Sequence, residues 1–389
     1  GDNVSVTVTF SEVVDKTGTP QLTLAVGSDN RTATYASGTG NAPLVFTYTI
    51  QTGDTDTDGI SIRANALALN SGTIRDAAGN NATLTNNAVS GNASYKVDTT
   101  APTANYPVAT DDVGTVRGAL DNGSTTDDTD LVLSGTNESG SIVKVYNSTT
   151  ELDNATVSGT SWSYTATLAN VTTYDFNVRE TDLAGNTSAA TSDFTVTVNT
   201  TAPTISSIVI SSATGIQNNL LNVGDNVSVT ATFSESVIVD NASGAPTLTL
   251  VVGDDNQTAT YRSGSGGTTL VFQYTIQAGE TDSNGISMRA DVLALNSGTI
   301  KDTTGNNATL THSALTDNAS YKVDTTAPTA NFTKANDNVG TVRGDFTSDN
   351  TTDDTALVLS GTNESGSSVK VYDNSTELGA ATVSGTSWS

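Results

Sequence analysis

The sequence has no cysteine, little positive charge and few aromatic residues. Without cysteine there is no disulfide bond and no thiolate chemistry, so domains with small cores need another source of stability. The 389 residues include 15 Lys and Arg against 41 Asp and Glu, a net charge of −26. This balance excludes nucleic acid as a partner and favours a cationic one. No apolar run is long enough for a membrane-spanning helix, so no membrane span is predicted.

Recognisable catalytic motifs are missing as well. The one histidine, His312, stands in a loop-like stretch where a matching part of the chain has Asn86, and it is predicted to lie on the surface. Neither H-E-x-x-H nor G-x-S-x-G occurs. Acidic pairs are plentiful, but they recur with the repeats described below, and a catalytic site in every repeat would be unusual. We therefore expect no enzymatic activity.

The residues that are abundant favour strands and turns. Thr and Val favour strands, whereas Asn, Asp and Gly favour turns; good helix formers are scarce, and only short stretches such as Arg63–Leu69 could form a helical turn. Apolar residues alternate with Thr or Ser in Val4–Phe10, Phe46–Ile50 and Phe194–Val198. This alternation, with turn residues about every ten positions, predicts an all-β protein of antiparallel sandwiches.

Long motifs occur twice along the chain. KVDTTAPTA begins at Lys96 and again at Lys322, GDNVSVT begins at Gly1 and at Gly224, and a variant, VNTTAPTI, begins at Val198. We read the repetition as tandem immunoglobulin-like β-sandwiches, with the T-T-A-P-T signatures at their boundaries. They give a first A repeat (1–98), a first B repeat (99–199), a second A repeat (200–324) and a second B repeat (325–389).

The two outer repeats are shorter than their copies. The first A repeat lacks the opening stretch that Thr200–Val223 supplies in the second, and the second B repeat stops at its Trp. We expect the chain to be a window of a longer array. Because Pro fixes φ and holds the preceding residue extended, D-T-T-A-P predicts a stiff joint, and the sandwiches are expected to form an extended rod with neighbouring repeats as partners.

The motifs resemble those of a known family. VDTTAPT, DDVGTVRG, TTDDTDLVLSGT, WSYTATL and TDLAGN in the B repeat resemble the Ig-like repeats of large bacterial surface adhesins, the BapA-like proteins secreted by type I systems. GDNVSVTVTFSE, TGDTDTDGISI and LNSGTIRDAAGNNA in the A repeat resemble a second repeat type of large secreted bacterial surface proteins. The resemblance implies an extracellular or cell-surface location, a spacer role in adhesion or biofilm, and calcium ions that stiffen the joints. Glycans or a host surface would be bound through parts outside this sequence.

Calcium takes six to eight oxygen ligands, mainly carboxylates and carbonyls. In a sandwich, the linker, the first loop and a later turn could gather such residues at one pole, and carboxylates packed there would repel one another without a cation. The alternative is that they are solvated turn residues. The candidate ligands, taken mostly from the resemblance, are Asp98, Asp111, Asp112, Asp127, Asp128, Asp130 and Asp182 in and before the first B repeat, and Asp324, Asp337, Asp353 and Asp354 in and before the second.

A weaker calcium candidate lies in the A repeat. Asp54, Asp56 and Asp58 match the start of an EF-hand loop, D-x-D-x-D-G, but position twelve is Asn65 rather than Glu. Because the flanks read as strands, a plain hairpin turn competes with a calcium-binding turn. The remaining weak candidates are Asp76 in the first A repeat and Asp282, Asp291 and Asp302 in the second.

Other functions remain open from the sequence. The domains could pair laterally into a filament, sheath or surface layer. An array of carbohydrate-binding modules would need Trp162 and Trp388 exposed as stacking platforms, whereas packing in the core is the simpler interpretation. N-x-S/T sequons are dense, so the chain is also a candidate glycoprotein.

Overall fold

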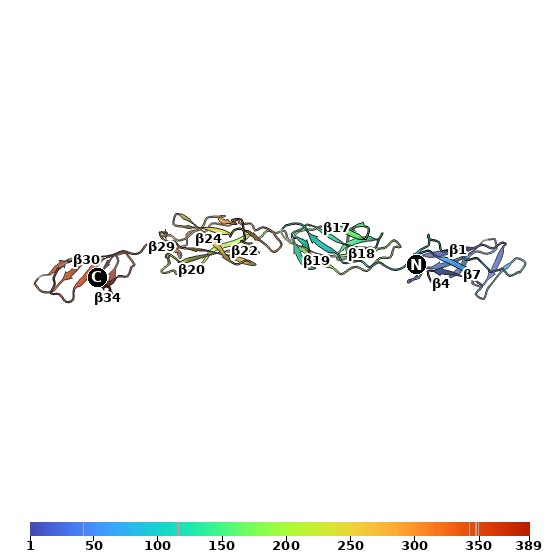
Figure 1. Ribbon diagram of the computed structural model, residues 1–389, viewed down its shortest axis with the longest axis horizontal. Helices are drawn as coiled ribbons and strands as arrows, with labels where there is room; N and C mark the ends of the chain where they lie inside the picture. The colour runs from blue at the N-terminus through green and yellow to red at the C-terminus, as the bar shows by residue number, and fades with distance from the viewer. Residues whose placement is uncertain (42, 115–116, 342, 347, 349) are drawn as a thin grey trace. The chain divides into compact units, whose positions relative to one another are not determined.

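The computed structural model describes residues 1–41, 43–114, 117–341, 343–346, 348 and 350–389 (Figure 1). These residues form β-strands joined by turns, and the described part of the chain has no α-helix. It accordingly has no helix long and apolar enough to cross a membrane. The all-β prediction is confirmed.

The chain divides into two compact units, residues 1–201 with 304–306, and residues 202–303 with 307–389. In the first unit, residues 1–98 form a five-stranded antiparallel sheet and two small ladders. The sheet order is β1 (Asn3–Val8), β5 (Leu44–Thr49), β4 (Asp29–Ser37), β3 (Gln21–Val26) and β7 (Ser61–Ala68). The ladders pair β2 (Val14–Thr17) with β8 (Thr73–Asp76), and β6 (Thr55–Asp56) with β9 (Val97–Asp98).

Residues 99–199 of the same unit form two five-stranded sheets. One has the order β11 (Gly118–Ala119), β10 (Val108–Asp111), β13 (Asp130–Thr136), β17 (Ser161–Thr167), β16 (Thr156–Ser158). The other has the order β12 (Ser124–Thr126), β19 (Phe194–Val198), β18 (Thr172–Thr181), β14 (Ile142–Asn147), β15 (Thr150–Asn154), and only its β12–β19 pair is parallel.

The second unit repeats this plan. Its largest sheet has the order β20 (Ile205–Thr214), β22 (Asn226–Asp240), β25 (Gly267–Thr275), β24 (Asp255–Ser263), β23 (Thr247–Val252), β27 (Leu293–Ala294), with β28 (Thr299–Lys301) also on β22. A small sheet joins β21 (Leu220–Leu221), β29 (Lys322–Asp324) and β26 (Thr281–Asp282). Residues after 324 form the sheet β31 (Gly344–Phe346), β30 (Ala330–Asp337), β32 (Val358–Asn363), β36 (Ser387–Trp388), β35 (Val383–Ser384), and the hairpin β33 (Lys370–Asp373) with β34 (Thr376–Ala380).

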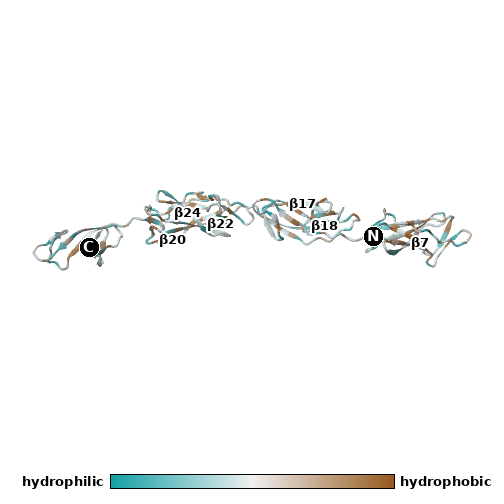
Figure 2. Cartoon of the chain, in the orientation of Figure 1, coloured by the Kyte–Doolittle hydropathy of each residue, from teal (hydrophilic) through white to brown (hydrophobic). Residues whose placement is uncertain are grey.

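Among the described residues, alternate strand positions build three apolar cores, whose buried members fall within residues 14–97, 109–198 and 208–323. Figure 2 shows hydrophobic residues along the strands and mainly hydrophilic loops. Trp162 is 3% exposed and Trp388 is 6% exposed, so both tryptophans are core residues. Trp162 lies so close to Gly135 that a Cβ there would come within 2.7 Å of the indole Nε1. This packing leaves neither ring available as a sugar platform.

Two local predictions were wrong. Most of Arg63–Leu69, a possible helical turn, belongs to strand β7, which ends at Ala68; within it Asn65 has φ 59° and interrupts the ladder with β3. His312 is half-buried rather than a free surface residue, because its Nε2 accepts a hydrogen bond from the Val292 amide at 3.0 Å. Tertiary hydrogen bonds that no local pattern contains determine both conformations.

Candidate functional site at the repeat junctions

Each D-T-T-A-P linker begins with the same small turn. The side-chain Oδ1 of Asp98 accepts a hydrogen bond from the Thr100 amide at 2.9 Å, and Asp324 accepts one from Thr326 at 3.0 Å. In the variant linker, Asn199 Oδ1 accepts the corresponding bond from Thr201 at 3.0 Å. Because neutral Asn makes the same turn as Asp, the turn does not need the negative charge.

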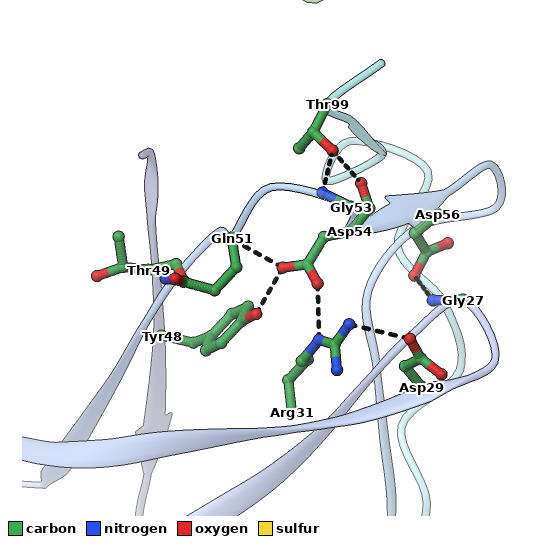
Figure 3. A network of polar contacts seen from close by, with 10 residues as sticks. All are labelled: Gly27, Asp29, Arg31, Tyr48, Thr49, Gln51, Gly53, Asp54, Asp56 and Thr99. Carbon is green, nitrogen blue, oxygen red and sulfur yellow. Dashed lines mark hydrogen bonds and ion pairs between the residues drawn. The ribbon is translucent and has the colours of Figure 1, made fainter.

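The first Thr of the linker is bonded to the A repeat before it. Thr99 Oγ1 accepts from the Gly53 amide and donates to the Asp54 carbonyl, both at 3.0 Å (Figure 3). In the second copy, Thr325 Oγ1 accepts from Gly279 at 3.0 Å and donates to the Glu280 carbonyl at 2.8 Å. A hydroxyl that both donates and accepts fixes the position at which the linker leaves its domain.

The B repeat holds its linker with a different residue. Asn170 accepts a hydrogen bond from the Thr200 amide at 2.8 Å and donates to Thr201 Oγ1 at 3.0 Å. Asn170 lies in a tight turn in which Val171 has φ 56°, an uncommon conformation for a β-branched residue. The linker residues are thus fixed to both types of repeat, although the anchoring side chains differ.

Beneath Thr99 lies Asp54, which is 1% exposed. Its carboxylate accepts from Arg31 Nε at 2.6 Å, Tyr48 OH at 2.5 Å and the Gln51 amide at 2.9 Å, as Figure 3 shows. Burial by itself would raise the pKa of Asp54, but the hydrogen bonds and the Arg31 charge outweigh it and hold this pKa below its ordinary value. The side chain is therefore an ionised anchor of the turn that carries the linker.

The second A repeat keeps this anchor with altered residues. Glu280 stands in place of Asp54, and Gln257 stands in place of Arg31. Glu280 accepts from Tyr274 OH and from the Gln277 amide. Burial, and then the hydrogen bond to Glu280, raises the pKa of Tyr274. The tyrosine–carboxylate contact is present in both copies, whereas the arginine is found only in the first.

The EF-hand-like run forms a loop held by the chain itself. Asp56 is buried, and its carboxylate accepts from the amides of Gly27 at 2.8 Å and Gly59 at 2.7 Å. Asp282 makes the matching bonds to Gly253 at 2.9 Å and Gly285 at 2.6 Å. Asp58 points to solvent.

Asp291, another weak calcium candidate, accepts from the His312 amide at 2.7 Å. The carboxylates of Asp56, Asp282 and Asp291 thus accept hydrogen bonds from backbone amides. These bonds close the turn, and the loop does not have the open form of an ion-binding loop.

A second turn, D-x-x-G-N, connects a linker to the repeat after it. Asp182 accepts from the Asn186 amide and from Asn186 Nδ2, both at 2.8 Å, and Asn186 Nδ2 also donates to the Asp98 carbonyl at 3.0 Å. Asp76 and Asn80 form the same turn in the first A repeat. The structure thus brings two predicted residues, Asp98 and Asp182, together through an asparagine that the sequence analysis did not single out.

The same contact occurs once more within the first unit. Asn306, which follows the predicted ligand Asp302 in its own D-x-x-G-N turn, donates from Nδ2 to the Asn199 carbonyl at 2.8 Å. Asp302 is buried. The recurring signal for these contacts is the G-N pair at Gly185-Asn186 and Gly305-Asn306, which could have been read from the sequence.

The remaining acids of the first B repeat lie on two neighbouring loops. Asp111 accepts from Thr126 Oγ1 at 2.6 Å and from the Val113 amide at 3.0 Å. Asp128 accepts from the Asp130 amide at 2.8 Å and the Asp112 amide at 3.3 Å. Asp111 and Asp128 are buried, whereas Asp112 and Asp130 are exposed.

Asp127 lies against Gly114, where a Cβ would come within 2.3 Å of its Oδ2. The second B repeat repeats this design around Thr352, with Asp337 and Asp354 as the buried pair and Asp353 against Gly340. The matching loops indicate a shared structural role for these acids.

The predicted acids of the first B repeat do not gather at one end of the sandwich. Asp111 lies beside the start of β13, because Thr110 pairs with Val132, and Asn199 donates to the nearby Thr126 carbonyl at 2.8 Å. Asp182 follows Thr181, which pairs with Ile142 beyond the other end of β13. The first loop therefore lies near the linker that follows the repeat, whereas Asp98 and Asp182 lie at the linker that precedes it.

The described residues contain no group of three or more His, Cys, Asp and Glu side chains placed to hold a metal ion. In four buried acids, both carboxylate oxygens accept hydrogen bonds from the chain; these acids are Asp54, Asp56, Asp111 and Asp128. Such bonds satisfy these oxygens without a cation. Calcium at the predicted acids stays a prediction.

Comparisons with known proteins give weak likenesses only. No family model and no curated protein matches the sequence. Among solved structures, the fibronectin(III)-like modules of Clostridium thermocellum CbhA align at 13% identity and a TM-score of 0.23, over 53% of this chain and 90% of that one. SGBP-B of the Bacteroides ovatus mixed-linkage glucan utilization locus, solved with a heptasaccharide, aligns at 15% identity and a TM-score of 0.17, over 71% and 70%. At these scores no function is transferred from either protein.

Proposed function

We propose that this chain is a spacer segment of an extracellular bacterial surface protein, in which tandem β-sandwiches carry load and separate other parts of the protein. The observation that carries the proposal is the repeated linker turn. Three linkers start with the same side-chain-to-amide bond, and each is held by the repeat before it. Repeated, fixed connections are what a structural array requires, because a spacer must transmit position from one domain to the next.

The extracellular location and the role in adhesion or biofilm rest on the resemblance of the sequence motifs to those of BapA-like adhesins. A catalytic role has little support: the one histidine uses Nε2 as an acceptor for the Val292 amide and has Nδ1 at 2.9 Å from the Ser313 carbonyl. An array of sugar-binding modules has lost its main support, since both tryptophans are buried.

Calcium enters this proposal as an addition to a joint that the chain already forms. Asp112 and Asp130 of the first B repeat are exposed, and their loops lie beside the linker residue Asn199. Together with backbone carbonyl oxygens and water they would supply the oxygen ligands that calcium prefers, and the ion would neutralise part of the negative charge there. The corresponding loop of the second B repeat has Asn338 and Ala356 in place of Asp112 and Asp130, so we expect it to bind calcium more weakly.

The spacer role is tested by stretching the full chain between two handles in a force spectrometer. Independent load-bearing domains give separate unfolding events, and each event lengthens the chain by about 3.5 Å per residue, or roughly 350 Å for the first B repeat. A single event for the whole chain, or extension without resistance, would contradict the proposal.

A filament subunit is distinguished by sedimentation. Polymers that grow with protein concentration in calcium would favour lateral assembly over a spacer, whereas a monomer across the accessible concentrations supports the spacer. The same samples can be applied to glycan arrays, where retention of the chain would revive the carbohydrate-binding alternative.

A further inference from the structure

The two A repeats differ in one partly buried ionic contact. In the first copy, Arg31 bridges two acids: its Nε lies 2.6 Å from Asp54 Oδ1, and its Nη2 lies 2.9 Å from Asp29 Oδ2 (Figure 3). The Asp54 side chain is fully buried and the Arg31 side chain is 31% exposed, so water only partly screens this contact. The first repeat therefore contains a guanidinium site that the chain fills with its own arginine.

The second A repeat keeps the acids and lacks the arginine. The equivalents of Asp29 and Asp54 are Asp255 and Glu280, and a neutral residue, Gln257, takes the position of the arginine. In residues 200–324, all of which the structure describes, the side chains of Asp255 and Gln257 make no hydrogen bond or ion pair. The change is a substitution inside a repeat that has neighbouring repeats on both sides. The second copy thus has the acceptors of a guanidinium site without its cation.

The two acids of the second copy line one polar pocket of about 730 Å³. Asp254, which stands where the first copy has Ser28, lines it as well, and so does Lys322, whose equivalent is Lys96. Glu280 is half-buried, and each of its carboxylate oxygens accepts one hydrogen bond from the chain. Because a carboxylate oxygen has two lone pairs, each oxygen can still accept a bond from a ligand.

A guanidinium group suits this pocket better than a metal ion does. The part of the chain that the structure describes has no group of three or more His, Cys, Asp and Glu side chains placed to hold a metal. A planar guanidinium needs fewer acceptors, because its donors point outward in a fixed fork and can bridge two carboxylates, as Arg31 does in the first copy. The net charge of −26 also attracts a basic partner over a longer range.

We propose that the pocket at Glu280 and Asp255 binds an arginine side chain of a basic partner protein. Glu280 accepts from one edge of the guanidinium and Asp255 from another, in the way that Asp54 and Asp29 accept from Arg31. The contact gives the second A repeat a docking point that the first repeat lacks, because the first is occupied by its own chain. The proposal does not depend on the spacer function or on calcium.

The test uses the full chain and the blocked peptide acetyl-Gly-Arg-Gly-amide, with binding followed by the amide signals of the chain in two-dimensional NMR. We expect saturable shifts at Gly279 and Glu280 and none at Gly53 and Asp54, the matching pair in the first copy. A peptide with lysine in place of arginine has the same charge but lacks the planar fork, so it should bind about tenfold more weakly.

Substitutions in the chain distinguish a site from general charge attraction. Gln257→Arg gives the second copy the residue of the first and should abolish binding, because the chain then fills the pocket itself. Asn256→Arg is the matched control: it adds the same charge on the opposite face of β24 and should leave most of the binding.

Three results would overturn the proposal. They are the absence of a saturable shift with the arginine peptide, equal binding of the arginine and lysine peptides, and equal loss of binding in Gln257→Arg and Asn256→Arg. The peptide comparison uses the unchanged chain, so misfolding of a variant does not affect it.

Discussion

At the residue scale, the two copies of each repeat show which side-chain properties the fold requires. Asn86 Oδ1 accepts from the Ala66 amide at 2.8 Å, and in the second copy His312 Nε2 accepts from the Val292 amide at 3.0 Å. Both side chains also place a nitrogen against the carbonyl of the next residue, Asn86 Nδ2 at 2.8 Å and His312 Nδ1 at 2.9 Å, so Asn and His share this polar pair rather than their shape. In the linkers, the exchange of Asp98 for Asn199 likewise shows that an oxygen is required and a charge is not.

The first prediction concerns the buried carboxylate of Asp54. Asp54→Ala leaves the Tyr48 hydroxyl and the Gln51 amide without their acceptor in a site that water hardly reaches. We expect a loss of about 2–4 kcal/mol in the free energy of unfolding of the first A repeat. Urea unfolding monitored by circular dichroism measures it. Asp29→Ala is the control, since Asp29 binds the same Arg31 from an exposed position; equal losses in the two variants would show that the buried network is not what stabilises the turn.

At the scale of elements, alternation predicted the strands well because their side chains have one buried and one exposed face. Phe194–Val198, predicted from its period of two, is β19 with the same bounds. The period says nothing about the tertiary bonds of a short segment, so Arg63–Leu69 was misread. The period also does not show at which end of the sandwich a loop lies. Asp111 and Asp182 were therefore expected together, although their loops lie at opposite ends of β13.

The recurring D-x-x-G-N turn supports the second prediction. Asn186→Ala keeps the backbone bond to Asp182 but removes the two side-chain bonds, one to the Asp182 carboxylate and one to the Asp98 carbonyl. Asn80→Ala likewise keeps the backbone bond and removes the side-chain bond to Asp76, and no bond from Asn80 to a linker carbonyl is found among the described residues. We expect Asn186→Ala to cost about 1 kcal/mol more than Asn80→Ala, the usual net contribution of one hydrogen bond.

Amide hydrogen exchange of the residues 97–101 measures the local effect. Faster exchange in Asn186→Ala, with no change in Asn80→Ala, is the expected result. If both variants exchange these amides at the parental rate, the turn does not hold the linker.

At the scale of the whole molecule, the acids determine how stability depends on pH. Burial by itself would raise the pKa values of Asp54 and Asp182, but hydrogen bonds hold both below the ordinary value of 3.8. Because the folded pKa is the lower one, these groups stabilise the fold above about pH 4, and the contribution is lost as pH falls through the folded values. The third prediction is therefore a melting temperature that changes little between pH 7 and 5 and drops below pH 4.

The Asp54→Ala variant serves as the control for this pH profile. It has already lost one of the responsible groups, so its melting temperature should fall less steeply below pH 4 than that of the parent chain. Identical slopes would assign the acid response to surface carboxylates instead of the buried ones.

The net charge of −26 makes the response to calcium the most informative property of the whole chain. If calcium binds only the folded state at the loops around Asp112 and Asp130, it stabilises the first B repeat by about 2.7 kcal/mol at a hundredfold excess over Kd. The fourth prediction is a melting temperature that is higher in calcium than in EDTA at equal ionic strength, with magnesium as the matched divalent control. Calcium prefers flexible carboxylate and carbonyl ligands, whereas magnesium retains its waters, so a specific site raises the melting temperature more in calcium than in magnesium.

Asp112→Asn together with Asp130→Ala, which gives the first B repeat the residues of the second, should remove most of the shift. An equal response to both ions would mean that they merely screen the charge, and the buried acids would then be structural tethers alone.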